Sequence, residues 1–335
     1  MKISQSLTGL SLVAFLGACG GGGGDGIGSE NGPAPVAAPA TLTPANYVAA
    51  AQETLSSNAY LLDASSFVIG AQVTDPNVLI RFGQNQLTKL PGWFANATLQ
   101  AVGVTQSSTE PCDGGGALTI VENDINGNEE VDPGDSVQLT ANNCSFEGTV
   151  LNGQLNLTVN SIRGNLDSYP YTLSATVRFI NFTAQSASDR AVGNGSLTMD
   201  VQASSSNVQT VKLSTPDFTM ATTYSGAATS HTLQDYETNL QIGSTGSVTT
   251  WTSSVNGTLT SSAFDGRSVR IETPTSFVRS GSQTYPATGS ALITGAAGSK
   301  VRVTAVNATT VTIDLDADGN GSYETTVNKR WSEML

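Results

Sequence analysis

The stretch Leu173-Ser174-Ala175-Thr176-Val177-Arg178-Phe179 decides the fold of this chain, because apolar and polar residues alternate along it. Successive side chains of a β-strand point to opposite faces of a sheet, so a period of two indicates a strand with one buried face. The same alternation recurs at 154–159, 269–272, 301–304 and 311–315. From about residue 97 onward the sequence therefore predicts strands that share one apolar face.

No helical pattern is interleaved with these strands, which argues against a parallel α/β sheet. The predicted fold class is mainly β: an antiparallel meander, as a curled sheet, half-barrel or sandwich, preceded by a short helical segment. A membrane-spanning barrel is disfavoured because the runs are short and rich in Ser and Thr, without clear aromatic girdles. Turns are expected at four dipeptides, Asn152-Gly153, Asn194-Gly195, Asn256-Gly257 and Asp265-Gly266.

Helical signals occupy residues 43–96. Thr43-Pro44 offers an N-cap followed by Pro, and Tyr47, Ala51 and Leu55 repeat at a spacing of four. A second segment is expected to open at Asp75-Pro76 and to stop at Pro91-Gly92. The apolar faces of these two or three helices are expected to pack on the β-domain at 97–335.

The N-terminus predicts export. Lys2 precedes a short apolar run at 7–16, too short to span a bilayer, and Leu16-Gly17-Ala18-Cys19 follows. This pattern resembles a bacterial lipoprotein signal with its lipobox. The resemblance implies a signal peptide at 1–18, acylation of Cys19 with diacylglycerol, and sorting to the outer membrane because Gly20 follows. Two or more acyl chains anchor stably.

The residues at 19–42 are rich in Gly, Pro and Ala, so they are predicted to form a flexible tether. The net charge of −13 argues against nucleic acid and anionic lipid as partners. His231, the only histidine, is expected to be a solvated surface residue. Besides Cys19, the cysteines are Cys112 and Cys144, and an even pair in an exported chain predicts a disulfide.

Two acidic loops are the strongest candidates for a chemical site. In the first, oxygen-bearing side chains recur at alternate positions: Asp124, Asn126, Asn128, Glu130, Asp132 and Asp135. Calcium prefers six to eight oxygen ligands from a chain that wraps the ion. The segment resembles the calcium loops of EF-hands and dockerins, with two departures: Glu129 replaces the turn glycine, and Asp135 replaces the final Glu. Strand-like flanks at 117–121 and 136–140 make it a hairpin tip, with the two cysteines beyond the strand ends. The alternative is an ordinary polar turn.

The second loop lies at 314–324 and resembles a truncated Asp-x-Asp-Gly-Asn-Gly calcium loop. Its predicted ligands are Asp316, Asp318, Asn320 and Glu324, and Gly321 supplies the tight turn. Calcium in either loop is predicted to be structural.

These features favour a non-enzymatic, outer-membrane-anchored lipoprotein whose calcium-stabilised β-domain presents a binding or scaffolding surface for a protein, glycan or lipid. Whether the domain faces the periplasm or the cell exterior stays open. One alternative is a carbohydrate-active hydrolase that uses Asp and Glu alone, with two carboxylates flanking a cleft. Another is a periplasmic lipid or lipoprotein carrier built on an apolar half-barrel.

Overall fold

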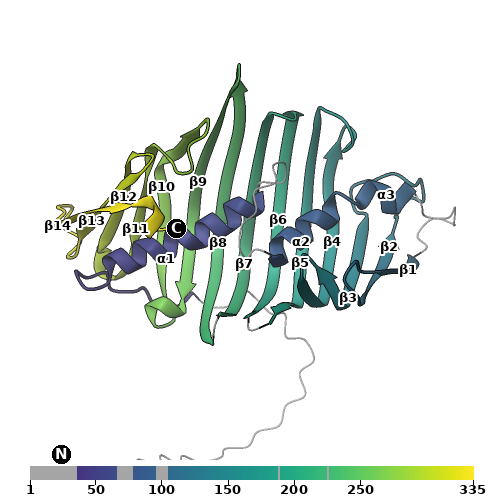
Figure 1. Ribbon diagram of the computed structural model, residues 1–335, viewed down its shortest axis with the longest axis horizontal. Coiled ribbons are helices and arrows are strands. Elements are labelled where there is room, and N and C mark those ends of the chain that lie inside the picture. The colour runs from purple at the N-terminus through teal and green to yellow at the C-terminus, as the bar shows by residue number, and fades with distance from the viewer. Residues whose placement is uncertain (1–35, 66–77, 96–104, 188, 225) are drawn as a thin grey trace, which may run out of the picture. The chain divides into compact units, whose positions relative to one another are not determined.

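The computed structural model describes residues 36–65, 78–95, 105–187, 189–224 and 226–335 (Figure 1). The chain divides into two parts, Met1–Gly32 and Pro33–Leu335, and all described residues belong to the second. The predicted signal peptide, Cys19 and most of the predicted tether therefore lie outside the described residues.

One antiparallel sheet of 14 strands makes up most of the fold, and neighbours in space are neighbours in sequence. The strands are β1 (Thr105–Pro111), β2 (Ala117–Asn123), β3 (Ser136–Phe146), β4 (Thr149–Arg163), β5 (Tyr171–Ser186), β6 (Asp189–Ser205), β7 (Val208–Tyr224), β8 (Ala227–Thr245), β9 (Val248–Ser261), β10 (Arg267–Ser280), β11 (Thr288–Thr294), β12 (Lys300–Asn307), β13 (Thr310–Asp316) and β14 (Thr325–Arg330). The predicted mainly β meander is thus confirmed. All 14 strands belong to one sheet, so the fold is not a sandwich of two sheets, and the sheet is open because β1 and β14 are not paired with each other.

The sheet has two unlike faces. On β5, Leu173, Ala175, Val177 and Phe179 are buried, whereas the residues between them are partly or fully exposed. We call the face that carries these four buried residues the inner face and the opposite one the outer face. Strands β2 to β13 bury residues of one face, which supplies most of the core, as the alternation at 173–179 predicts, whereas the edge strands β1 and β14 bury none.

In the described part of the chain, three helices precede the sheet, which agrees with the prediction of two or three: α1 (Tyr47–Ser65), α2 (Val78–Leu87) and α3 (Leu90–Ala95). Figure 1 shows α1 and α2 lying across the strands. α1 packs against β7, β8, β9, β12 and β13, and α2 packs against β4, β5 and β6. Pro91-Gly92 was expected to end the second helix but lies inside α3, where Pro occupies the first turn, a position that needs no backbone N–H. The predicted start at Asp75-Pro76 lies outside the described residues.

Among the described residues, no helix is both long and apolar enough to cross a membrane. The described residues also form three short 3-10 helices: η1 (Ser262–Phe264), η2 (Ala296–Gly298) and η3 (Trp331–Glu333).

Turns were expected at three Asn-Gly dipeptides and one Asp-Gly dipeptide, and this expectation is wrong for the three Asn-Gly sites. Gly153, Gly195 and Gly257 lie inside β4, β6 and β9, at or beside register shifts in the ladder. A β-carbon on Gly153 would lie 2.5 Å from the carbonyl oxygen of Asn181 on the next strand. These glycines therefore allow close backbone approach at bulges that bend the long strands. Only Asp265-Gly266 forms a turn between strands.

The chain joins the sheet before α1 begins. Pro39 forms a parallel bridge with Ser268 of β10, and the Ala40 amide donates to the Ser268 carbonyl over 2.8 Å. Leu42 is 1% exposed. Residues 38–42 are therefore docked on the domain, although they fall within the range 19–42 that composition predicts as tether.

Candidate metal centres

The first acidic loop joins β2 to β3, as the flanking strand patterns predict. The Asp124 carboxylate closes the loop from inside: its Oδ1 accepts from the amides of Asn126 (3.2 Å) and Gly127 (2.6 Å), and its Oδ2 accepts from Glu129 (3.0 Å). Asn128 Oδ1 in turn accepts from the amide of Glu130 over 2.9 Å. This sequence of side-chain-to-backbone bonds wraps the chain around the carboxylate.

Asp135 closes the same loop from its other end. This side chain is 0% exposed and accepts from the amides of Ile125 (3.0 Å) and Asp132 (2.7 Å). Burial raises the pKa of Asp135 above its ordinary range, although the two amide hydrogen bonds work against this rise. The nearby carboxylates of Asp124 and Asp132 raise it further. A cation among these groups would relieve both the burial penalty and the repulsion.

Glu129 occupies the loop position where glycine was expected. Its φ of 64° lies in the left-handed region that glycine adopts without strain. The sharp turn is therefore made, and Glu129 carries the conformational cost.

The second acidic loop joins β13 to β14 and repeats the arrangement. The Asp316 carboxylate is 0% exposed and accepts from the amides of Gly319 (2.8 Å), Asn320 (3.1 Å) and Gly321 (2.9 Å). Glu324 closes the loop, because its Oε2 accepts from the amide of Ala317 over 3.1 Å. The two loops thus share one backbone plan.

The loops differ in how closely their carboxylates approach one another. In the second loop, carboxylate oxygens of Asp316, Asp318 and Glu324 all lie within 4.8 Å of one another. Among the described residues this is the only such group of three or more acidic, His or Cys side chains. Asn320, the fourth predicted ligand, donates its Nδ2 to Asp318 over 2.9 Å.

In the first loop, the predicted ligands are joined by hydrogen bonds instead. Asn126 and Asn128 donate their side-chain amides to the same oxygen of Asp132, over 2.8 and 2.7 Å. Their side-chain oxygens already accept from the backbone amides of Asn128 and Glu130. To ligate a cation through these oxygens, the two side chains would have to reorient and give up these hydrogen bonds. The residue types suit calcium in both loops.

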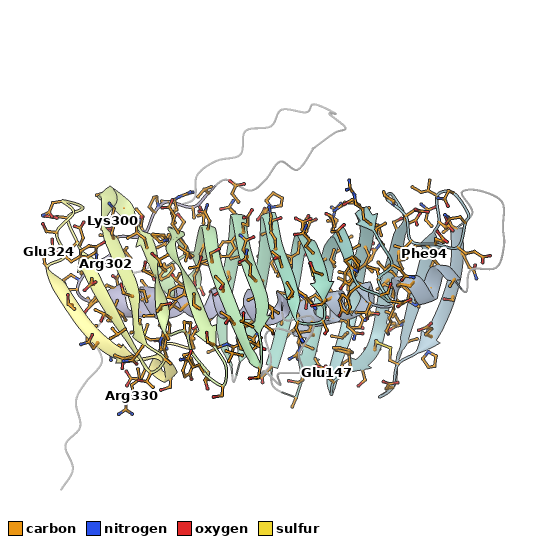
Figure 2. All side chains as sticks on the ribbon, turned by 90° about the horizontal axis from the view of Figure 1, so that it is seen from above. Phe94, Glu147, Lys300, Arg302, Glu324 and Arg330 are labelled. Atoms are coloured by element: carbon orange, nitrogen blue, oxygen red, sulfur yellow. A yellow bond between two sulfur atoms is a disulfide. The ribbon has the colours of Figure 1, made fainter. Side chains whose placement is uncertain are left out.

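A basic group stands beside the second loop. The Arg302 guanidinium pairs with Asp314 (Nη2 to Oδ2, 2.8 Å) and lies 4.1 Å above the ring of Tyr323. Figure 2 shows Arg302 and Glu324 at the same end of the sheet. Arg302 therefore holds the strand just before the loop in place.

The predicted disulfide is present. Cys112 and Cys144 are bonded, with Cα atoms 5.4 Å apart. Cys112 follows the end of β1 and Cys144 lies in β3, so the bond joins the strands that flank β2 at the end opposite the acidic loop.

His231 is not the solvated residue that the sequence predicts. Its side chain is 12% exposed, and its Nε2 lies 2.6 Å from Oε1 of Glu53 on α1. Ser261 donates its hydroxyl to the same oxygen over 2.5 Å. The hydrogen bond from His231 lowers the pKa of Glu53, and the Ser261 bond adds to the effect against the opposing effect of burial. This clasp, Glu53–His231–Ser261, joins α1 to the inner face.

The clasp could not be found from sequence, since its three residues lie far apart along the chain and follow no spacing rule. It is not a nucleophilic triad, because serine and histidine both contact the carboxylate rather than each other.

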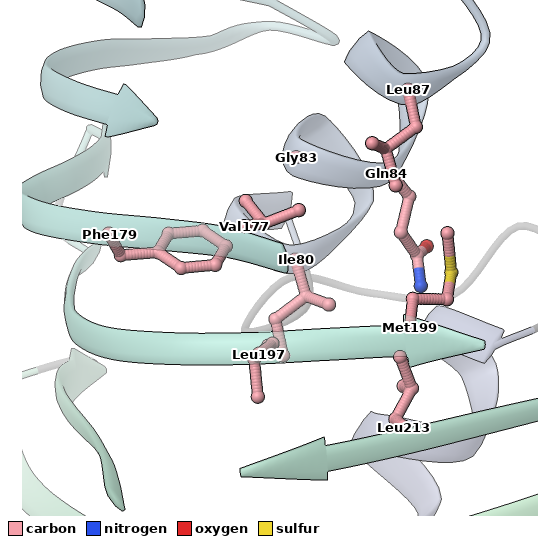
Figure 3. Close-up of a pocket in the computed structure, with 9 residues that line it drawn as sticks. All are labelled: Ile80, Gly83, Gln84, Leu87, Val177, Phe179, Leu197, Met199 and Leu213. Carbon is pink, nitrogen blue, oxygen red and sulfur yellow. The ribbon is translucent and has the colours of Figure 1, made fainter. Parts of the chain in front are cut away.

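A small hollow lies between α2 and the inner face (Figure 3). Its cavity volume is only about 10 Å³. The lining is apolar, for example Ile80, Phe179 and Met199, apart from the Gln84 amide that points into it. This space has room for about one water molecule, too little for a larger ligand.

Comparison with protein-family models, with curated proteins and with solved structures finds no match to this chain.

Proposed function

We propose that this protein is a non-enzymatic lipoprotein, anchored to the outer membrane through Cys19, whose β-domain presents a binding surface on the outer face of its sheet. The observation that carries the proposal is the chemistry of that face. Its side chains alternate with the buried core residues and are mostly Ser, Thr, Asn and Gln on β4 to β7.

A row of hydroxyls crosses five strands at a single register. Thr158, Thr176 and Thr198 stand side by side on β4, β5 and β6, and Ser136 and Ser214 extend the row at its two ends. The Thr176 and Thr198 hydroxyls lie 3.1 Å apart. Rows of donors and acceptors at strand spacing favour a neutral, hydrogen-bonding partner such as a glycan over a charged one.

A glycan array probed with the full chain tests this surface. The double variant Thr176→Val, Thr198→Val keeps side-chain volume but removes two central hydroxyls, so glycan binding is expected to fall while the melting temperature changes little. The matched control is Thr222→Val, Thr229→Val, which removes a hydroxyl pair with a 2.6 Å contact at the far ends of β7 and β8. Equal binding by wild type and the central variant would overturn the outer-face assignment.

Calcium in the two acidic loops completes the proposal. One ion would be held by oxygen ligands from Asp124, Asn126, Asn128, Glu130, Asp132 and Asp135. Another would be held by Asp316, Asp318, Asn320 and Glu324. Each ion would neutralise repelling carboxylates and fix a hairpin tip. Since a ligand of the folded state raises stability by mass action, the melting temperature should rise with calcium and fall with chelator. Identical melting under both conditions would remove calcium from the proposal.

The orientation of the anchored domain is tested by protease treatment of intact cells. Loss of the protein would place the binding face outside the cell. Protection until the outer membrane is breached would place it in the periplasm, where envelope glycans become the candidate partners.

A further inference from the structure

Among the described residues, α1, β7 and β8, which pack against one another, carry five buried hydroxyl groups without any hydrogen-bond partner. They belong to Thr54, Ser57, Thr215, Tyr236 and Thr238. Each of the five side chains is at most 7% exposed. A buried polar group without a partner is costly, and native cores rarely contain several together.

The strand residues among them form one patch of the inner face. Thr215 of β7 stands directly opposite Tyr236 of β8, and Thr238 stands opposite Leu213 on one side and Val255 on the other. Burial raises the pKa of Tyr236, so its phenol stays protonated and can donate. The patch therefore offers hydroxyl donors within apolar surroundings.

α1 covers this patch with small and polar residues. Besides Tyr47 and Leu55, its described buried side chains are Ala50, Ala51, Thr54 and Ser57, whereas α2 buries Val78, Leu79, Ile80 and Phe82 among others. In the part of the chain that the structure describes, the pair Glu53–His231 is the ion pair that joins α1 to the strands. Over the described side chains, α1 therefore buries fewer large apolar residues than α2, and it covers hydroxyl donors that have no partner.

We propose that the interface between α1 and strands β7 and β8 is a binding site for a neutral acyl ester, with α1 as its movable wall. The aliphatic chain would lie along Leu213 and Val255, and the ester carbonyl would accept from the orphaned hydroxyls, Tyr236 first. A free fatty acid fits less well, because its carboxylate would enter beside the carboxylate of Glu53. This ligand site is separate from the outer face and from the calcium loops.

Binding is measured with the methyl ester of cis-parinaric acid, whose fluorescence rises in apolar sites, added to the full chain carrying Cys19→Ser. We expect saturable binding of the ester, weaker binding of the free acid, and tighter binding to the Glu53→Gln variant, in which α1 loses its charged clasp. Absence of saturable ester binding to both wild type and Glu53→Gln would overturn the proposal.

Tyr236→Phe separates a ligand contact from a folding defect. Because this hydroxyl has no partner to lose, the ligand-free variant should melt at or above the wild-type temperature, while ester affinity should fall by about three- to tenfold. Tyr171→Phe, a half-buried tyrosine of β5, is the matched control and should bind as wild type does. Unchanged ester affinity in Tyr236→Phe would exclude this patch as the site. Failure of the calcium or glycan tests would leave these outcomes unaffected.

Discussion

The two acidic loops carry nearly the same residues and the same backbone hydrogen bonds, yet they are held in the fold differently. Asp124 and Asp316 each accept from three amides of their own loop. The first loop closes on buried Asp135, in a hairpin with a disulfide at its opposite end. The second closes on exposed Glu324 and packs against a neighbouring turn, where a β-carbon on Gly319 would lie 2.9 Å from the carbonyl oxygen of Ala297. Local sequence therefore shapes the turn, and the surroundings decide how closely the carboxylates gather.

The largest expected effect is the loss of stability on removing the disulfide of the first hairpin, which the second hairpin lacks. Replacing Cys112 and Cys144 by Ser removes a crosslink spanning 32 residues and should lower the free energy of unfolding by about 3–4 kcal/mol. Urea unfolding measures the loss, and hydrogen exchange locates it. Amides of β2 and β3 should lose protection first, while those of β13 keep theirs. Equal loss of protection at both loops would show that the disulfide does not act locally.

Substitution of Asp124 and of Asp316 tests whether the two carboxylates, which accept the same pattern of hydrogen bonds, contribute equally to the free energy of unfolding. Asp124→Asn and Asp316→Asn each replace a charged acceptor of three amides, and each should destabilise the fold by about 1.5–3 kcal/mol. Asp316→Asn should cost more, because Asp316 is 0% exposed and Asp124 is 9% exposed. Thermal unfolding in chelator measures both. A larger loss for Asp124→Asn would contradict the ranking.

The residue at the sharp turn also differs between the loops: it is Gly321 in the second loop and Glu129 in the first. Gly321 has a φ of 90° with nothing within 4 Å of an added β-carbon, so Gly321→Ala should cost about 1–2 kcal/mol through backbone strain alone. Glu129→Gly relieves the same strain at φ 64° and should stabilise by up to about 1 kcal/mol. Melting curves of the two variants should therefore shift in opposite directions. A shift of the same sign in both would mean that the two turns are not equivalent.

The smallest expected effect is a dependence on pH. Because burial raises the pKa of Asp135, its protonated form is favoured in the folded state, and the free energy of unfolding should fall as pH rises through the range just above the ordinary Asp pKa of about 3.9. Glu53 acts in the opposite sense, since its lowered pKa means that stability is lost as pH falls through its folded value. Urea titrations in chelator at several pH values, compared with Asp135→Asn, isolate the first effect. If the free energy of unfolding of Asp135→Asn varied with pH as that of wild type does, the proposed contribution of Asp135 would be excluded.

How far the sequence leads can be judged from single residues. The alternation at 173–179 predicted the strand, its buried face and the meander, because a period of two is a local property of the backbone. The spacing of Asp124, Asn126 and Asn128 predicted a wrapped loop for the same reason. Asn152-Gly153 was misassigned, since a glycine needed for a turn and one needed for a bulge look alike until the neighbouring strand is placed.

By itself, the sequence determined what depends on neighbours along the chain: the one-sided strands, the order of helices before sheet, the two acidic hairpin loops and the pairing of Cys112 with Cys144. Only the tertiary structure decided what depends on neighbours in space. It placed His231 against Glu53, aligned Thr176 with Thr198 on the outer face, and brought Asp316, Asp318 and Glu324 together. The physical reason is that backbone periodicity and turn chemistry act over a few residues, whereas side-chain contacts between elements are fixed only when the strands take their register and the helices settle on the inner face.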